Sequence, residues 1–423
     1  MASFLTVGLT FCQRTAEQSF SKGMEYAAQG EFERAKEKFE KTLKVEPNHE
    51  LANKFLMLIA DINAQKIQTK TAVPFFEGAT YALKGQWAEA IVAYNKAIEI
   101  EPNHAMPYMS RGKAYAQKGE YNCAISDFTK AIEVNPKEAE AYYNRGIAYH
   151  LRGLNDLAIS DFTKAIEINP RDAEIYNNRG KACAKNGQYD QAISDYNRAI
   201  DIDPKDVEAY YNRGIAYHFK GLNVKAISDY STAIEKAPQY VEAYNNRGVA
   251  YQEIGQMDNA ILDYSKAIKI RPTYAEAYYN RGRAYYIRAY YKQAIADYTK
   301  AIEIRPMYGV AYYNRGRAHY FSGRFDLAIS DFTTAIEINP RDAEAYSNRG
   351  TAYASKGQYD RAITDYNWAI EANPRLATAY IDRGLVYMER LGDKNRACSD
   401  WQRACELGEC YHYTIAKRMG NCE

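Results

Sequence analysis

The sequence lacks an excess of charge of either sign. Its 423 residues include 55 Lys plus Arg and 53 Asp plus Glu, so no broad electrostatic field attracts nucleic acid or an anionic membrane. It also lacks the phosphate-binding pattern G-x-x-x-x-G-K and the zinc-binding pattern H-E-x-x-H, and its six histidines are scattered. These absences argue against an enzyme and predict a protein without a cofactor or a metal site.

Proline is scarce as well, but most of it is strictly placed. Nine of the 12 prolines follow one another at one constant step: Pro102, Pro136, Pro170, Pro204, Pro238, Pro272, Pro306, Pro340 and Pro374. A fixed period of this length is typical of a solenoid, in which each repeat is one supersecondary unit. A unit this short cannot fold alone, so we expect each to bury its apolar face on its neighbours.

The repeat from residue 137 to residue 170 shows what each unit contains. The recurring residues ahead of its closing proline are Tyr142, Gly146, Tyr149, Ala158, Phe162 and Ala165. Apolar residues at spacings of three and four predict two amphipathic helices, 139–151 and 156–168, joined by a turn at Gly153. Glycine on one helix and alanine on the next let two helices cross closely.

This skeleton of Trp/Tyr, Gly, Tyr, Ala, Phe/Tyr, Ala and Pro resembles the tetratricopeptide repeat, closely over residues 69–408 and loosely over residues 14–47. The resemblance implies an all-α fold, a right-handed α-solenoid superhelix of tandem 34-residue helical hairpins. It also implies a non-enzymatic scaffold that binds an extended peptide or a partner protein in its concave groove. The alternative is a structural protein that assembles with itself through its N-terminal segment and repeat surfaces. Nucleic acid and membrane are not expected as partners.

Four regions follow from the spacing of the repeats. Residues 1–13 form an apolar segment, which is interpreted as a shortened signal, a cap on the first repeat or a docking segment for another molecule. Residues 14–68 hold a divergent repeat and an extra helix without the repeat's glycine. Residues 69–374 hold nine regular units, and residues 375–423 hold a terminal repeat and a cysteine-rich capping helix such as solenoids require.

Four of the seven cysteines lie near the C-terminus: Cys398, Cys405, Cys410 and Cys422. Cys398 and Cys405 are seven residues apart on one predicted helix, roughly 10 Å, which is too far for a disulfide between them. We predict the pairs Cys405 with Cys410 and Cys398 with Cys422, which favours an extracytoplasmic location without excluding the cytoplasm. The alternatives are four reduced core cysteines or a zinc site, although no C-x-x-C pair supports zinc.

One asparagine recurs on the first helix of seven units, at Asn144, Asn178, Asn212, Asn246, Asn280, Asn314 and Asn348. If this helix lines the groove, its amides suit the N–H and C=O groups of an extended peptide. The row resembles the asparagine ladder of O-GlcNAc transferase. The alternative is that these amides bond to neighbouring helices or face water. Tyrosines that precede the asparagine are predicted as further contacts: Tyr143, Tyr211, Tyr279 and Tyr313.

An arginine follows each asparagine, where the family commonly has leucine, and an aspartate stands at a fixed place on the second helix of the same unit. The predicted pairs are Arg145 with Asp161, Arg179 with Asp195, Arg213 with Asp229, Arg247 with Asp263, Arg281 with Asp297, Arg315 with Asp331, and Arg349 with Asp365. Arg383 and Asp400 extend the series. Two early units lack both partners together, with Glu77 and Ala93 in one and Lys22 and Lys38 in the other. Joint presence and joint absence indicate structural ion pairs between helices or between units.

Overall fold

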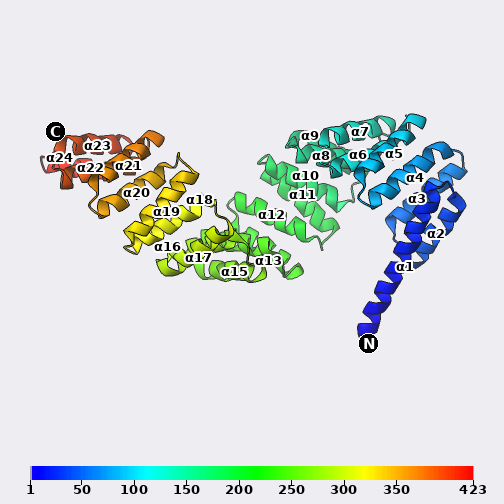
Figure 1. The fold of residues 1–423 in the computed structure, drawn as a ribbon, viewed down its shortest axis with the longest axis horizontal. Coiled ribbons are helices and arrows are strands. Elements are labelled where there is room, and N and C mark those ends of the chain that lie inside the picture. Colours follow the sequence, from blue (N-terminus) through cyan, green and yellow to red (C-terminus); the bar gives the residue numbers. More distant parts are fainter. Residues whose placement is uncertain (1, 423) are drawn as a thin grey trace. The chain divides into compact units, whose positions relative to one another are not determined.

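The computed structural model describes residues 2–422, with side chains from residue 15 onward, and the secondary-structure elements of this part of the chain are α-helices joined by short turns. It divides into two compact units, Met1–Ala216 and Tyr217–Glu423. Within each unit, consecutive helices pair as hairpins that stack side by side (Figure 1). This arrangement confirms the predicted all-α class of tandem helical hairpins.

The first unit begins with two hairpins that have an unpaired helix between them. Its helices are α1 (Ala2–Ala28), α2 (Phe32–Val45), α3 (Glu50–Asn63), α4 (Thr69–Leu83), α5 (Trp87–Ile100), α6 (Ala105–Gln117), α7 (Tyr121–Val134), α8 (Ala139–Leu151), α9 (Asn155–Ile168), α10 (Ala173–Lys185) and α11 (Tyr189–Ile202). Helix α12 (Val207–Phe219) contains the boundary between the two units.

The second unit continues the series of hairpins with the same repeat length. Its helices are α13 (Asn223–Lys236), α14 (Val241–Glu253), α15 (Met257–Ile270), α16 (Ala275–Ile287), α17 (Tyr291–Ile304), α18 (Gly309–Phe321), α19 (Phe325–Ile338), α20 (Ala343–Ser355), α21 (Tyr359–Ala372), α22 (Ala377–Arg390), α23 (Lys394–Glu406) and α24 (Tyr411–Arg418). Helices α22 and α23 form the last hairpin, and the short α24 packs on α23.

The hairpin of α8 and α9 shows how the repeat residues act. Its first helix has the predicted bounds, and its second begins one residue earlier than predicted. A Cβ atom on Gly146 would lie 2.8 Å from Cε1 of Phe162, so only glycine allows the helices to approach this closely. Gly153 reverses the chain with φ of +75°, a left-handed conformation that glycine adopts at little cost.

Two positions depart from this pattern. Ala289 occupies the turn position where the other hairpins have glycine, and it keeps the same left-handed conformation with φ of +60°. Cys183, which replaces the Tyr149-type core residue, is fully buried and has no disulfide partner. The turn between α16 and α17 therefore keeps its left-handed backbone although alanine replaces glycine there.

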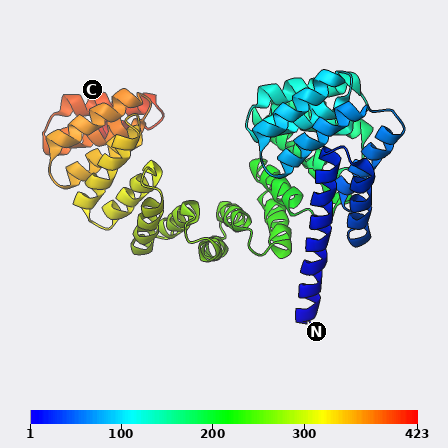
Figure 2. The same ribbon diagram turned by 45° about the vertical axis from the view of Figure 1, so that its right-hand side comes forward.

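The start of the chain is the irregular part of the first unit. Helix α1 runs across the expected boundary at residue 13, and its first half extends away from the other helices of the unit (Figure 2). Met1 and the side chains of residues 2–14 lie outside the described part, so the expectations for residues 1–13 stay predictions. Helix α3 has no hairpin partner, and its Phe55, Leu58 and Ile59 join one apolar core with α1, α2 and α4.

The C-terminal end is closed by α24. Disulfides join Cys398 to Cys422 and Cys405 to Cys410, the pairs expected from the sequence. Trp401, Ala416 and Cys422 form one buried cluster between α23, α24 and the segment after it. The last apolar face of the second unit is therefore covered by a cap that two covalent bonds hold in place.

Candidate functional site

The repeated arginines and aspartates are close together in both units. Nε and Nη2 of each arginine donate to the two carboxylate oxygens of the aspartate on the second helix of the same hairpin. The distances run from 2.6 to 2.9 Å in the pairs Arg111–Asp127, Arg145–Asp161, Arg179–Asp195, Arg247–Asp263, Arg281–Asp297, Arg315–Asp331 and Arg349–Asp365. Arg383 pairs with Asp400 in the same way, one residue further along.

A third donor links each of these pairs to the preceding hairpin. Nη1 of Arg145 donates to the hydroxyl of Thr129 at 3.0 Å, and Nη1 of Arg247 donates to Ser231 at 2.8 Å. The same place is taken by Asn95 for Arg111 and by Asn197 for Arg213. We call this arrangement of arginine, aspartate and the acceptor of the arginine's Nη1 atom the clamp. It joins the two helices of one hairpin and the second helix of the hairpin before it.

The clamps are buried, and this decides their role. The hydrogen bond to Asp161 raises the pKa of Arg145 despite burial, and burial raises the pKa of Asp297 despite the partner Arg281. Asp161 and Asp297 are each only 6% exposed. A ligand cannot reach these carboxylates without opening the hairpin, so the clamp supports the fold. The pair Arg111–Asp127 was missed from the sequence, although it has the same spacing as the predicted pairs.

Several of the recurring asparagines donate a hydrogen bond to a side chain of the previous repeat. The acceptor is the residue immediately before the asparagine of that repeat. Asn178 donates to the hydroxyl of Tyr143 at 3.0 Å and to the main-chain oxygen of Glu174 at 3.0 Å. The same two bonds recur from Asn314 to Tyr279 and Val310, and from Asn348 to Tyr313 and Glu344. Where the preceding residue is asparagine, Asn212 donates to Asn177 at 3.2 Å and Asn280 to Asn245 at 3.0 Å.

These bonds engage the donors of the amides within the chain, and peptide binding by the asparagines stays a prediction. Both amide hydrogens of Asn178, Asn314 and Asn348 are engaged within the chain, so they are not open donors for a ligand. What each amide keeps is its oxygen, a hydrogen-bond acceptor. All seven asparagines are half-buried. We call this row of hydrogen-bonded asparagines the asparagine line.

The tyrosines of the row are part of the same network. Tyr143 donates to Glu174 at 2.5 Å and Tyr313 donates to Glu344 at 2.9 Å. Burial and the neighbouring glutamate raise the pKa of both tyrosines, so their hydroxyls stay protonated. Tyr143, Tyr279 and Tyr313 are half-buried, and their hydroxyls are engaged. Their hydroxyls hold the asparagines in place, and contact of these tyrosines with a ligand stays a prediction.

First helices of successive hairpins contact one another directly, as α6 does with α8 and α16 with α18. The asparagine line follows these helices within each unit, with Asn144, Asn178 and Asn212 in the first. The amide groups of Asn178, Asn314 and Asn348 are held through their nitrogens, whereas the amide oxygen of Asn246 accepts a hydrogen bond from Asn245 at 3.3 Å. Amide oxygens can bind the main-chain N–H groups of an extended peptide.

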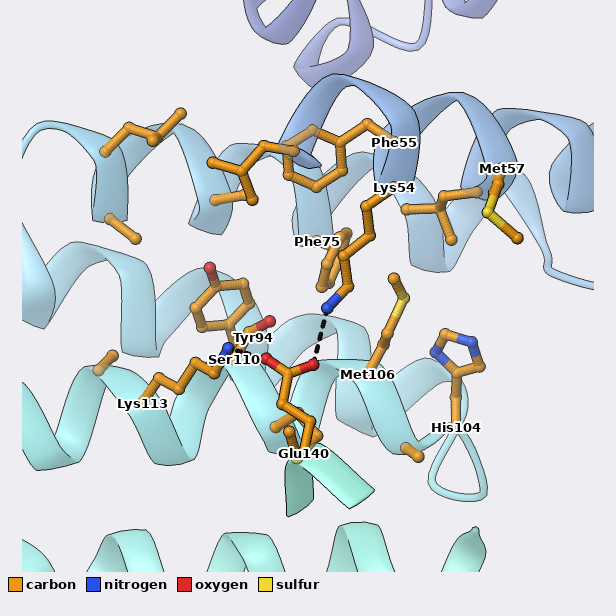
Figure 3. A pocket seen from close by; sticks show the side chains of 18 of the residues that line it. Lys54, Phe55, Met57, Phe75, Tyr94, His104, Met106, Ser110, Lys113 and Glu140 are labelled. Atoms are coloured by element: carbon orange, nitrogen blue, oxygen red, sulfur yellow. Dashed lines mark hydrogen bonds and ion pairs between the residues drawn. The ribbon is translucent and has the colours of Figure 1, made fainter. Parts of the chain in front are cut away.

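Helix α3 forms a second candidate site that sequence reasoning missed. A pocket of about 570 Å³ lies between α3, α4 and α6, with Trp87 and Tyr94 of α5 also at its wall (Figure 3). Lys54 of α3 reaches Glu140 of α8 at 3.0 Å, and Lys113 of α6 pairs with the same carboxylate. We call this space the α3 pocket. Its only sequence signal was the extra helix without a repeat partner.

The charged groups of the α3 pocket lie at its edge. Burial acts to raise the pKa of Glu140, but Lys113 and Lys54 outweigh it, and the pKa is lowered. Burial lowers the pKa of His104, whose Nδ1 atom is enclosed without a hydrogen-bond partner. The described residues contain no group of three or more His, Cys, Asp and Glu that could hold a metal ion. Nor does any described helix combine the length and apolarity of a membrane span.

Stacked helical hairpins with a polar row along their first helices define a helical-repeat protein. The chain belongs to the tetratricopeptide repeat family, whose models match residues 19–49, 78–308 and 313–407 in overlapping segments. This confirms the resemblance drawn from the repeated skeleton. No curated protein matches the sequence.

Solved structures similar to the chain include YrrB, MamA and a chain of the Cut9-Hcn1 assembly. YrrB, described as a tetratricopeptide repeat protein with an unusual peptide-binding site, is 27% identical over 44% of this chain and 95% of its own, with a TM-score of 0.39. MamA is 32% identical over 39% of this chain and 96% of its own, with a TM-score of 0.37. The Cut9-Hcn1 assembly of APC/C contains a chain 15% identical over 91% of this one and 92% of its own, with a TM-score of 0.45.

Proposed function

We propose that this protein is a non-enzymatic scaffold that binds an extended peptide segment of a partner protein along the part of the asparagine line that lies within one unit. The observation that carries the proposal is the fixed orientation of the amides. In Asn178, Asn314 and Asn348 both amide hydrogens are held inside the chain, which leaves the amide oxygens as acceptors. Acceptors held in place before binding lose little conformational entropy when a ligand arrives.

We expect the ligand to bind through its main chain, because its N–H groups can donate hydrogen bonds to the repeated amide oxygens. An extended segment also suits a surface whose chemistry repeats once in every hairpin. The glutamates near the line are engaged, since Glu208 pairs with Lys181 at 2.6 Å and Glu242 with Arg271 at 2.6 Å. The surface therefore has no unpaired acidic row there that would demand a basic ligand.

The test is selection of 12-residue peptides from a random phage library on the intact protein, followed by affinity measurements on variants. Changing Asn144, Asn178 and Asn212 together to Ala removes the acceptors of the first unit. We expect at least a tenfold loss of affinity, because each acceptor contributes about 0.5–1.5 kcal/mol. The matched control changes Asn169 and Asn339, which are exposed and outside the line, to Ala. Equal binding to both variants would refute the asparagine line as the site.

We further propose that the protein works in an oxidising, extracytoplasmic compartment. The support is the pair of disulfides that closes the C-terminal cap, because such bonds persist mainly outside the reducing cytosol. Mass spectrometry of unreduced protein from its native source checks this. Four free thiols at Cys398, Cys405, Cys410 and Cys422 would remove the argument.

A further inference from the structure

The first helices change character at one end of the asparagine line. The position of Tyr143 in α8 corresponds, one and two repeats earlier, to Met109 in α6 and Phe75 in α4, which are 7% and 5% exposed. The position of Asn144 corresponds to Ser110 in α6. In these two units the tyrosine and asparagine positions of the asparagine line are occupied by apolar or small residues. Three of these residues, Phe75, Met109 and Ser110, line the α3 pocket.

Helix α3 supplies the opposite wall, as Figure 3 shows for Phe55 and Lys54 above α6. Leu51, Phe55 and Leu58 line the pocket from this side and face Met106 and Met109. The volume of about 570 Å³ falls within the roughly 300–1,000 Å³ typical of ligand pockets, which are mostly apolar with a few polar groups. The regular hairpins contain no helix equivalent to α3, so this wall belongs to this part of the chain alone within the described residues.

The charges at the edge nearly cancel one another. Lys54 and Lys113 share Glu140, and Asp61 pairs with Lys66 at 3.0 Å. An anionic ligand would lose its hydration without gaining an unpaired cation, and Glu138, the lining carboxylate outside these ion pairs, accepts a hydrogen bond from Asn135 at 3.3 Å. An uncharged apolar group gains by leaving water. The charge balance therefore favours an uncharged apolar occupant.

The α3 pocket is continuous with the asparagine line. Glu140 at its edge and Asn144 are one turn apart on α8, and Nδ2 of Asn144 donates to the main-chain oxygen of Glu140 at 2.7 Å. We propose that the α3 pocket holds two neighbouring large, uncharged apolar side chains of the same peptide that lies on Asn144, Asn178 and Asn212. This proposal rests on the proposed function and sets the register in which the peptide binds.

The probes are two synthetic peptides, acetyl-Leu-Phe-Gly-Ser-Gly-Ser-Gly-Ser-amide and acetyl-Ser-Gly-Ser-Gly-Ser-Gly-Phe-Leu-amide, which place the apolar pair at either end. Each has a matched version with Ala-Ala in place of the pair. The readout is the spectrum of intact protein labelled with methyl-¹³C methionine. Met57, Met106 and Met109 line the α3 pocket, and the exposed Met307 in the second unit serves as a reference. We expect the three pocket signals to shift with one Leu/Phe peptide and not with its Ala-Ala version.

The variant L51E/L83E places charge at the pocket mouth. Leu51 and Leu83 are 40% and 52% exposed, so the fold tolerates the change. The control L157E/L327E changes two leucines that are each 49% exposed and outside the pocket. We expect the first variant to bind the Leu/Phe peptide at least tenfold more weakly than the control. Equal affinity in both variants would overturn the proposal.

Other outcomes separate this proposal from the one on which it rests. Equal binding of Leu/Phe and Ala-Ala peptides, weakened by the asparagine variant, would keep the asparagine line and overturn the α3 pocket. Pocket signals that shift with the Leu/Phe peptide even in the asparagine variant would keep the pocket and refute the line. Pocket signals that shift with protein concentration alone would overturn the proposal, because a second copy of the chain would then be the occupant.

Discussion

The hairpin of α4 and α5 and the hairpin of α14 and α15 have the same backbone and different interiors. Both pack a tyrosine under a glycine, with Tyr94 at Gly78 and Tyr264 at Gly248. The later hairpin contains the clamp, whereas α4 and α5 have no arginine and no aspartate at the corresponding positions. The comparison shows that close packing of helices is sufficient for the hairpin, and that the clamp is an addition to it.

The clamp nevertheless constrains the helices once it is present. A buried pair of charges contributes little net stability, because desolvation offsets most of the attraction. Its geometry is specific, however, since a guanidinium and a carboxylate fit each other in one plane. With its third bond to the preceding hairpin, the clamp fixes how one hairpin sits on the next. The unclamped start of the chain instead packs Phe55 of α3 against Phe76 of α4.

The largest effect is expected from breaking one clamp. In D263A the guanidinium of Arg247 stays half-enclosed without its carboxylate, which costs about 3–5 kcal/mol. Hydrogen exchange of the amides in α14 and α15 measures this loss locally, as suits an array whose stability is a sum over repeats. The double variant R247L/D263A, which removes both charges, should regain most of the loss. A double variant as unstable as D263A would show that the clamp itself stabilises the hairpin.

The converse change installs a clamp in the unclamped hairpin. Ala93 is 2% exposed, so A93D alone buries an unpaired carboxylate, at a cost of roughly 3 kcal/mol or less after the pKa of the new group rises. Adding E77R to A93D should restore stability to near that of the natural chain. The midpoint of denaturant unfolding of the first unit is the measurement. No rescue by the arginine would mean that the hairpin backbones differ more than their shared packing indicates.

A smaller effect is expected at the turn of Ala289. This residue is left-handed, with φ of +60°, a conformation that costs a residue with a Cβ atom about 1–2 kcal/mol. A289G should therefore stabilise the α16–α17 hairpin by about 0.5–1 kcal/mol, after the entropy that glycine adds to the unfolded chain. The matched control is G255A, where the added Cβ meets nothing within 4 Å and only the conformation is strained. The two variants should shift thermal unfolding in opposite directions.

The smallest effect concerns pH and the edge of the α3 pocket. The pKa of Glu140 is lowered in the folded chain, so its contribution is complete above its unfolded pKa of about 4.3 and is lost as pH falls through the folded value. The methyl signal of Met57 should then move only at a pH below the ordinary range for glutamate. In E140Q the movement should vanish. A signal that titrates equally in E140Q would assign the change to another group.

The sequence by itself determined the period, the hairpins and most of the clamps. These features depend on residues close in the chain and on a pattern that recurs, so the bounds of α8 and the pairing of Arg145 with Asp161 could be predicted from spacing. The cap cysteines could be paired for the same reason, because the reach of a disulfide is short. The family resemblance added the expectation that the first helices line a groove.

Only the tertiary structure decided what the asparagines can offer and where the pocket lies. Asn178 donates to the hydroxyl of Tyr143, 35 residues earlier. The sequence of a single helix does not show whether the nitrogen or the oxygen of the amide makes that bond. Lys54 and Glu140 are 86 residues apart, and their contact depends on how α3 crosses the neighbouring helices. The packing of the regular hairpins follows from residues that recur at a fixed spacing in the sequence. The position of α3, which lies outside the repeats, depends on tertiary contacts that this spacing does not predict.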